Sequence, residues 1–363
     1  MIVKRVKSFS IALIVLCWSC IIFGESQFQR SIDFNLDTGR RADATKLDKN
    51  DYKKAVRKNH PFTKVALSPI DPVELVDFLV FLYEDTVPAV VEKDGKPRIP
   101  KIIHQIWLGS EFPDKYRSWR QTWLDKHPDW VYILWTDNSK NYFMGDFVES
   151  EEELKLILKS ENCSGKRLVF DVSRMDMVNR ESFLQAPNYG SKSSILRYEI
   201  LYRYGGVYLD TDLECFRSFD PLVYGYDFFA GMAPINMQKT QVANGLIGSI
   251  PGHSVLQYCI KNTSLDRFNN KIVDILQSTV AATGPGFLTR AIFYAAGKGD
   301  TKDVVLPPSY FYSLRREMLR LIYSRDESFP PKFFSDLPSS KFVAPPEAFA
   351  VHYWETSWMK KYK

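Results

Sequence analysis

The spacing of apolar residues changes from a helical to a strand period within residues 193–215. Over residues 193–204 the apolar and aromatic positions recur every three or four residues, at Leu196, Ile200, Leu201 and Tyr204. Ser193 and Ser194 offer hydroxyl groups for the start of a helix, and Gly205-Gly206 offers the positive-φ positions at which many helices end. The pattern therefore predicts a helix that stops at the glycine pair.

A short apolar strand and two acidic residues are predicted directly after the glycine pair. Val207 to Leu209 are apolar or aromatic, and Asp210 and Asp212 follow two residues apart. In extended backbone this spacing puts both carboxylates on one face, with Thr211 turned away. Neighbouring carboxylates repel unless a cation or a hydrogen-bonding ligand lies between them. Mg²⁺ and Mn²⁺ suit such ligands and take further oxygens from water and phosphates. The pair predicts a metal–diphosphate site, and the alternative is a solvated strand end that carries two acids.

Strand and helix patterns alternate before this stretch. Residues 101–108 form a β-rich apolar run, residues 118–127 have a helical pattern, and residues 130–135 form a second apolar run. This alternation predicts an α/β fold with a mainly parallel sheet. Ligands of such sheets bind beyond the carboxyl ends of the strands, which places Trp107 and Gly109 near a bound ligand.

A histidine and several aromatic residues are concentrated near the end of the chain. Residues 350–358 read AVHYWETSW and include His352. An imidazole is a suitable third ligand for Mn²⁺ beside two carboxylates. Because convergent polar groups mark a site, we favour that role over the alternative, an aromatic cluster that covers a sheet edge. His104, in the middle of the first predicted strand, is instead predicted to be a core histidine.

The N-terminal residues resemble a targeting segment. Basic residues precede a short apolar run within residues 1–24, which predicts either a signal peptide or an uncleaved signal-anchor. Residues 25–97 are predicted to be a stem and helical lead-in, with a helix over residues 71–86. Residues 98–363 are predicted to be the main domain. The leader favours a secretory-pathway (Golgi-type) or, in a bacterium, an exported or inner-membrane location, with membrane contact through residues 1–24.

Composition narrows the functional classes only slightly. The chain has 363 residues, 45% of them hydrophobic, and a net charge of +5. This mild basic excess has no concentrated patch of the kind that nucleic-acid binding requires, so we expect no nucleic-acid partner. Outside the leader, Cys163, Cys215 and Cys259 allow at most one disulfide bond.

Four stretches together resemble one known family. They are IPKIIHQIWLG (99–109), SWRQTWLDKHPDWVYILWTD (118–137), SSILRYEILYRYGGVYLDTDLECFRSFDPL (193–222) and HYWETSW (352–358). They are similar to the glycosyltransferases that contain the Asp-x-Asp sugar-binding region, relatives of yeast α-1,6-mannosyltransferases, inositolphosphoceramide mannosyltransferases and bacterial capsule transferases. The resemblance implies a GT-A-like, Rossmann-type α/β fold. It also implies transfer of a mannose-, galactose- or glucose-type hexose from a UDP- or GDP-sugar to a glycan or glycolipid hydroxyl, with Mn²⁺ (or Mg²⁺) as cofactor and with retention of configuration.

The same resemblance implies roles for single residues. Asp212 would bind the metal, Asp210 would bridge the donor ribose and the metal shell, and His352 would complete the metal site. Arg197 would act with the two aspartates and reach donor hydroxyls. The implied donor-binding residues are Trp107, Gly109, Ser194, Arg197, Asp210, Asn244, Ser357 and Trp358.

One position departs from the family pattern. The family usually has Asp where this chain has Ser194, and that Asp accepts hydrogen bonds from donor hydroxyls. Its loss would cost about 1.5–3 kcal/mol of donor binding. The departure motivates an alternative, a catalytically silent sugar-nucleotide-binding or scaffold protein on the same fold. A third hypothesis, a phosphoesterase that uses Asp210 and Asp212, lacks a second carboxylate–histidine cluster to support it.

Overall fold

The computed structural model describes most of the chain beyond its N-terminal part. The described residues are 70–86, 95–233, 241–265, 275–313, 344–345 and 347–355. The predicted leader, most of the stem, and both Ser357 and Trp358 lie outside these ranges. Within them, no helix is long and apolar enough to cross a membrane.

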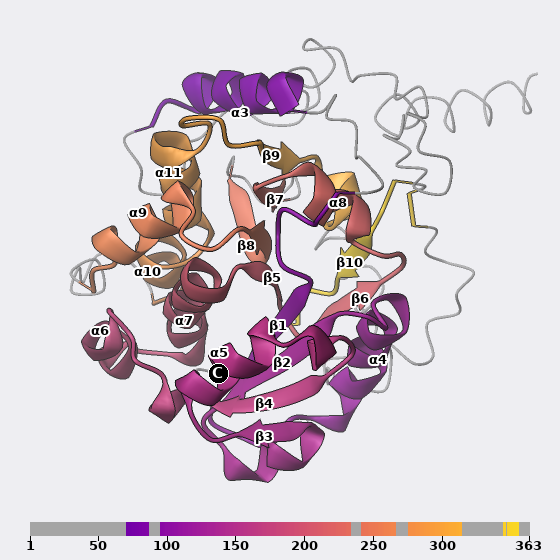
Figure 1. Cartoon of the computed structure of the whole chain (residues 1–363). Coiled ribbons are helices and arrows are strands. Elements are labelled where there is room, and N and C mark those ends of the chain that lie inside the picture. Colours follow the sequence, from indigo (N-terminus) through magenta and orange to yellow (C-terminus); the bar gives the residue numbers. More distant parts are fainter. Residues whose placement is uncertain are drawn as a thin grey trace, which may run out of the picture.

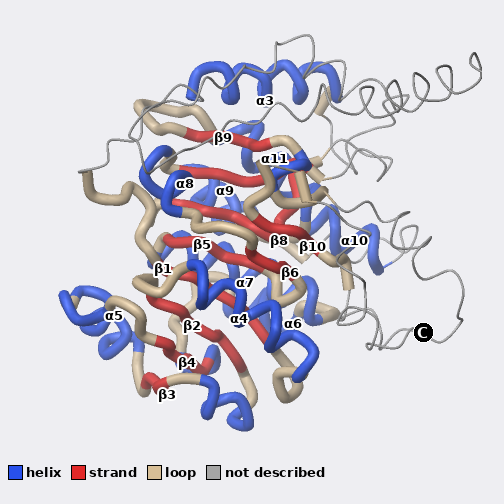
Figure 2. Tube along the Cα trace, turned by 90° about the vertical axis from the view of Figure 1, so that its right-hand side faces the viewer, coloured by secondary structure: helices blue, strands red, loops and turns tan. Residues whose placement is uncertain are grey.

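An eight-stranded sheet forms the centre of the structure (Figures 1 and 2). In spatial order the strands are β3 (Asp146–Val148), β4 (Arg167–Asp171), β2 (Val131–Thr136), β1 (Ile102–Trp107), β5 (Gly206–Leu209), β8 (Val242–Ser249), β7 (Phe228–Met232) and β9 (Asp303–Leu306). β8 runs antiparallel to its two neighbours, and all other pairs are parallel. The predicted α/β fold with a mainly parallel sheet is therefore confirmed.

Helices cover both faces of the sheet (Figure 1). They are α3 (Pro72–Thr86), α4 (Arg117–Lys126), α5 (Glu151–Lys159), α6 (Arg180–Gln185), α7 (Tyr189–Tyr204), α8 (Asp220–Gly225), α9 (Ser254–Asn262), α10 (Ile275–Ala282) and α11 (Pro285–Ala295). Helices α7, α9 and α11 lie on one face, and α4 and α8 lie on the other. Helix α3 lies beyond the edge strand β9 in both views (Figures 1 and 2).

Strand alternation divides the buried side chains into two cores. In β2, Ile133 and Trp135 point into the core under α7, whereas Tyr132 and Leu134 point into the core under α4. Successive residues of a strand face opposite sides of the sheet, so a sheet covered on both faces needs apolar residues at every position. This is why the predicted strands are continuous apolar runs.

The start of α7 differs from the prediction, whereas its end agrees. The helix begins at Tyr189, and Asn188 caps it by accepting a hydrogen bond from the Ser191 amide at 2.8 Å. The prediction from Ser193 and Ser194 was wrong because an amide oxygen at position 188 caps the helix a full turn earlier. Gly205 and Gly206 have φ values of +64° and +92°, as the glycine pair predicted.

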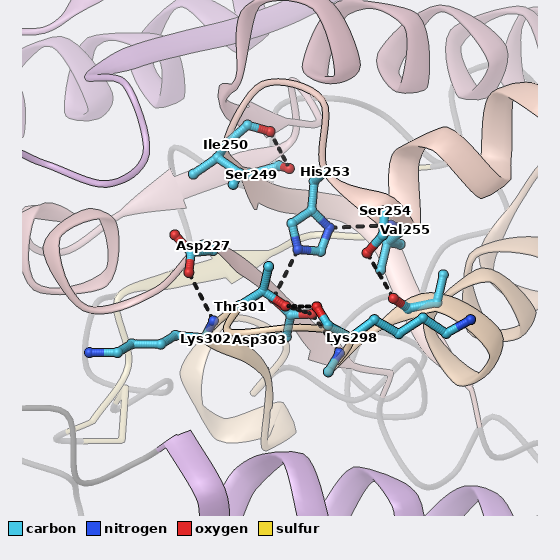
Figure 3. A network of polar contacts seen from close by, with 12 residues as sticks. Asp227, Ser249, Ile250, His253, Ser254, Val255, Lys298, Thr301, Lys302 and Asp303 are labelled. Atoms are coloured by element: carbon cyan, nitrogen blue, oxygen red, sulfur yellow. Dashed lines mark hydrogen bonds and ion pairs between the residues drawn. The ribbon is translucent and has the colours of Figure 1, made fainter.

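A buried polar network joins the first residue of β9 to the start of α9 (Figure 3). His253 accepts a hydrogen bond from the Val255 amide through Nδ1 and donates to Asp303 from Nε2 at 2.9 Å. Asp303 also accepts from the Gly297 amide at 2.7 Å. Because each of these ring and carboxylate contacts is made within the fold, this histidine–aspartate pair has a structural role. Elsewhere among the described residues, Cys163, Cys215 and Cys259 are free thiols.

Candidate metal and donor site

The Asp-Thr-Asp segment lies in a turn between β5 and β6 (Leu213–Cys215). The predicted extended backbone over Asp210 to Asp212 was wrong, because the chain leaves the main sheet here to pair with β10 (Ala350–His352). The Asp210 amide still donates to Gly245 O of β8 at 2.7 Å. The turn, rather than strand alternation, therefore brings the two carboxylates together.

One oxygen of Asp210 is held by the protein. Oδ1 accepts a hydrogen bond from the Tyr208 hydroxyl at 2.6 Å, and Arg197 Nη2 lies 3.4 Å from the same oxygen. The second oxygen, Oδ2, lies 3.7 Å from His352 Nε2. Tyr208 thus fixes the carboxylate with Oδ2 directed toward the imidazole.

Asp212 is held in the same manner from the C-terminal segment. Its Oδ2 accepts from the Glu355 amide at 2.7 Å, and its carbonyl oxygen accepts from the Tyr353 amide at 3.0 Å. Its Oδ1 lies 3.0 Å from His352 Nε2. The antiparallel pairing of β6 and β10 places His352 opposite Leu213, the next residue after Asp212. Sheet register therefore sets the distance between the imidazole and this carboxylate.

Three ligand atoms converge and fit a divalent cation. Asp210, Asp212 and His352 each offer one atom, and these atoms lie within 4.8 Å of one another. Both imidazole nitrogens of His352 are buried, and neither makes a well-oriented hydrogen bond to a described residue, although Nε2 is close to the carboxylates. His352 Nε2 is thus near one oxygen of each carboxylate without being oriented to donate to either of them. This arrangement suits a cation that all three atoms share. Oxygen and imidazole ligands of this kind suit Mn²⁺ or Mg²⁺.

The electrostatics of these residues reflect their proximity. Burial by itself lowers the pKa of His352, but the negative charge of Asp212 and the closeness of both carboxylates to Nε2 outweigh it and raise the pKa to about 9. Burial by itself raises the pKa of Asp212, but His352 and the Glu355 amide bring it below its usual value. The carboxylate is therefore ionised and ready to bind a cation at neutral pH.

Arg197 is buried in α7 and connects several of the predicted donor-binding residues. Its guanidinium lies over the Tyr208 ring, 4.2 Å from the centroid, and its Nη1 donates to Asn244 O. The Asn244 side chain in turn donates to Ser194 Oγ at 3.2 Å. The structure thus brings Ser194, Arg197 and Asn244 together beside Asp210.

A β-bulge in β8 places Asn244 at this position. Between Ala230 and Gly231 of β7 the pairing partner changes from Ile247 to Ala243, so residues 244–246 have no partner on β7. Bulges redirect side chains and are common beside functional sites. Here the bulged backbone supplies the carbonyl oxygens that accept from Asp210 N and Arg197 Nη1.

The other predicted donor-binding residues lie at the carboxyl end of β1 or outside the described ranges. The Gly109 amide donates to Asp137 Oδ1 at 2.6 Å. The Trp107 ring packs against Tyr116, with 5.3 Å between centroids, and the Tyr116 hydroxyl donates to Glu355 Oε2 at 3.2 Å. This chain of contacts joins β1 to the segment that holds Asp212. His104, as predicted, is a fully buried core histidine.

Two residues that hold the carboxylates escaped the sequence analysis. Tyr208 lies two residues before Asp210, so strand alternation carries a signal for its position. Glu355 acts through its backbone amide, which no residue pattern reveals.

The comparisons with known proteins agree with two of the four sequence stretches, those at residues 118–137 and 193–222. The family model described as the glycosyltransferase sugar-binding region containing the DXD motif matches residues 113–229, which include Arg197 and both aspartates but not His352. Inositol phosphoceramide mannosyltransferase 3 of Schizosaccharomyces pombe is 30% identical over 206 residues, 57% of this chain and 48% of that protein. A mannosyl phosphorylinositol ceramide synthase of Saccharomyces cerevisiae is 32% identical over 222 residues, 59% of this chain and 49% of that protein.

The chain thus spans about half the length of these curated relatives. Among solved structures, the PaToxG glycosyltransferase matches 61% of this chain and 78% of its own, with a TM-score of 0.42 and 18% identity. Over residues 113–229 the chain is therefore similar to the glycosyltransferase family whose sugar-binding region contains the Asp-x-Asp motif.

Proposed function

We propose that this protein is a metal-dependent glycosyltransferase that moves a hexose from a nucleotide-diphosphate sugar to a glycan or glycolipid hydroxyl, with retention of configuration. The convergence of Asp210 Oδ2, Asp212 Oδ1 and His352 Nε2 carries this proposal. The family match over the Asp-x-Asp region supports it. Manganese or magnesium would be held by these three residues.

The proposed mechanism assigns charge stabilisation to the metal site and orientation to the buried residues around it. A bound divalent cation would neutralise charge on the leaving diphosphate as a Lewis acid. Asp210 Oδ1 accepts a hydrogen bond from the Tyr208 hydroxyl, and Asp212 Oδ2 accepts one from the Glu355 amide. We call these the inner oxygens of the two carboxylates. The outer oxygens, Asp210 Oδ2 and Asp212 Oδ1, therefore need no rearrangement to bind. Such preorganisation is what makes electrostatic stabilisation effective in a site.

Donor contacts are assigned to the residues that lie beside Asp210. Asn244, Ser194 and Arg197 already contact one another, so a donor sugar would meet a preformed polar surface. Arg197 is 4% exposed and engaged with the backbone of β8. We therefore assign it first to the positioning of Asp210 and Asn244. Trp107, Gly109, Ser357 and Trp358 remain assigned to the donor on the family resemblance.

Mannose and a glycolipid are the preferred sugar and acceptor. The names of the two fungal relatives describe mannosyl transfer to inositol phosphoceramide. A chain with an N-terminal targeting segment over residues 1–24 would reach such acceptors at a secretory membrane. Both choices are part of the proposal.

The test is a transfer and hydrolysis assay with UDP- and GDP-sugars of mannose, glucose and galactose, with and without Mn²⁺. We expect Mn²⁺-dependent release of one nucleoside diphosphate from the wild type. Asp212→Asn should lower this release by on the order of 100-fold or more, whereas Asp114→Asn, the same change at a highly exposed ion pair, should leave it unchanged. Mn²⁺-dependent donor binding without turnover would favour the silent scaffold, and release of phosphate from simple esters would favour a phosphoesterase.

A further inference from the structure

The hydroxyl of Tyr312 is buried beside the three proposed metal ligands and donates to none of the residues that the structure describes. Tyr312 follows the short helical turn at Pro308–Tyr310 and is 1% exposed. No well-formed hydrogen bond joins its oxygen to a described residue, and the nearby Leu246 amide can only donate to it, so the O–H group has no acceptor among these residues. Buried hydroxyl groups are normally paired, because an unpaired one has lost its water without compensation. An unpaired phenol at this place therefore requires a physical reason.

Two glycines on neighbouring strands make room for the Tyr312 ring. A β-carbon on Gly231 of β7 would lie 2.8 Å from a ring carbon of Tyr312. A β-carbon on Gly245, in the bulge of β8, would lie 3.6 Å from the Tyr312 hydroxyl and 2.8 Å from Asp210 Oδ2. The hydroxyl and the outer oxygen of Asp210 thus border the same small space, which only a glycine at 245 leaves open.

The aromatic neighbours direct the phenol toward the ligand residues. Its ring centroid lies 5.7 Å from that of His352 and 5.5 Å from that of Trp354. The inner oxygen of Asp210 is already bonded to Tyr208, so the outer oxygen is the carboxylate atom left for a second phenol. The hydroxyl has almost no accessible surface, so a ligand arriving from solvent cannot reach it directly.

We propose that Tyr312 is a positioning residue that donates a hydrogen bond to Asp210 Oδ2 when a divalent cation occupies the site. This inference rests on the proposed function, because it requires the cation. Asp210 Oδ2 lies 3.7 Å from His352 Nε2, and the Tyr312 hydroxyl donates to no described residue. A cation bound by both Asp210 and His352 would replace the direct attraction between them. Asp210 would then be held by the hydroxyl groups of Tyr208 and Tyr312. The gained hydrogen bond exists only in the bound state, so it favours binding. Partners of ligating side chains commonly tune metal affinity in this way.

Tyr312→Phe tests the inference, because it removes the hydroxyl and keeps the ring. We expect the affinity for Mn²⁺ alone, measured by titration calorimetry, to fall on the order of 10-fold. The thermal midpoint of the metal-free protein should stay the same or rise, because the variant loses an unpaired buried group. Tyr208→Phe should instead lower both quantities, since it removes a hydrogen bond that the metal-free protein makes. Tyr226→Phe, at a buried tyrosine near Tyr83 of α3, should leave the Mn²⁺ affinity unchanged.

The outcomes separate the inference from the proposed function. Wild-type Mn²⁺ binding with equal affinity in Tyr312→Phe overturns the inference and leaves the metal-dependent transferase intact. A lower metal-free midpoint with unchanged affinity also overturns it, because the hydroxyl would then serve the fold. A wild-type protein that binds no Mn²⁺ overturns both.

Discussion

His352 Nε2 lies 3.0 Å from Asp212 Oδ1, although 140 positions separate the two residues in the sequence. The short sheet of β6 and β10 produces this contact, since His352 pairs with Leu213. The C-terminal segment is therefore an integral part of the candidate metal site, and the family match that ends at residue 229 does not include it.

Asp212→Asn should abolish metal binding and leave the fold in place. The amide keeps an oxygen for the Glu355 amide but removes the charge that attracts both the cation and His352. We expect the Mn²⁺-induced rise in thermal midpoint to disappear and turnover to fall by on the order of 100-fold or more. A variant that retains a wild-type Mn²⁺ response would place the metal elsewhere.

The fold should lose stability in mild acid because two core histidines are neutral. In His104, Nε2 donates to Gly205 O at 2.8 Å and Nδ1 accepts from Trp135 Nε1 at 3.1 Å. In His127, Nδ1 donates to Trp123 O and Nε2 accepts from the Phe219 amide, each at 2.9 Å. Burial lowers the pKa of each to about 4, against a weaker opposing effect of the hydrogen bond to the carbonyl.

The direction in which pH changes the stability follows from these lowered pKa values. The unfolded chain binds protons near pH 6.5 and the folded chain only near pH 4, so stability is fully present above pH 6.5 and falls below it. With two such groups, the free energy of unfolding should fall by up to about 2.7 kcal/mol per pH unit. Denaturant titrations between pH 6.5 and 5 measure this slope. The slope should be about halved in His127→Gln. An unchanged slope would show that His127 does not contribute to the loss of stability in acid.

The pattern of apolar positions predicted the central strands well, because a sheet buried on both faces leaves continuous apolar runs. Short polar elements were missed. For example, β3 (Asp146–Val148) is an edge strand with exposed Asp146, and no apolar run marks it. The helix start at Asn188 was missed because several residues nearby are also good caps.

The candidate site was predictable only as far as local motifs reach. Asp210, Asp212 and His352 were chosen from residue type and family resemblance, and the structure brings them together. The residues that orient them depend on long-range features. Tyr312 reaches the site through space left by Gly231 and Gly245, and Asp212 is held by a backbone amide at Glu355. Neither arrangement has a sequence signature.

Ser194→Asp should tighten donor binding, since it restores the acceptor that the family usually has. Ser194 lies one helical turn before Arg197 and accepts from Asn244, so a carboxylate there would have partners already in place. Because hydrogen bonds to charged groups contribute about 1.5–3 kcal/mol, we expect the KM for the donor to fall on the order of 10-fold. Ser194→Asn, of nearly equal size without charge, is the control. Equal KM values for the two variants would contradict a charge effect.

Trp354 connects backbone conformation to metal binding, because it has a φ of +55° just before the Glu355 amide that holds Asp212. Asn accepts this left-handed conformation readily, whereas a β-branched residue opposes it. Trp354→Asn and Trp354→Val both remove the indole, whose centroid lies 4.2 Å from that of His352. Only Val should also pull the Glu355 amide away from Asp212. The additional strain of about 1–2 kcal/mol should make Mn²⁺ bind roughly 10-fold more weakly to the Val variant than to the Asn variant. Calorimetric titration of both variants measures the difference, and equal affinities would show that the backbone conformation at residue 354 does not set the position of Asp212.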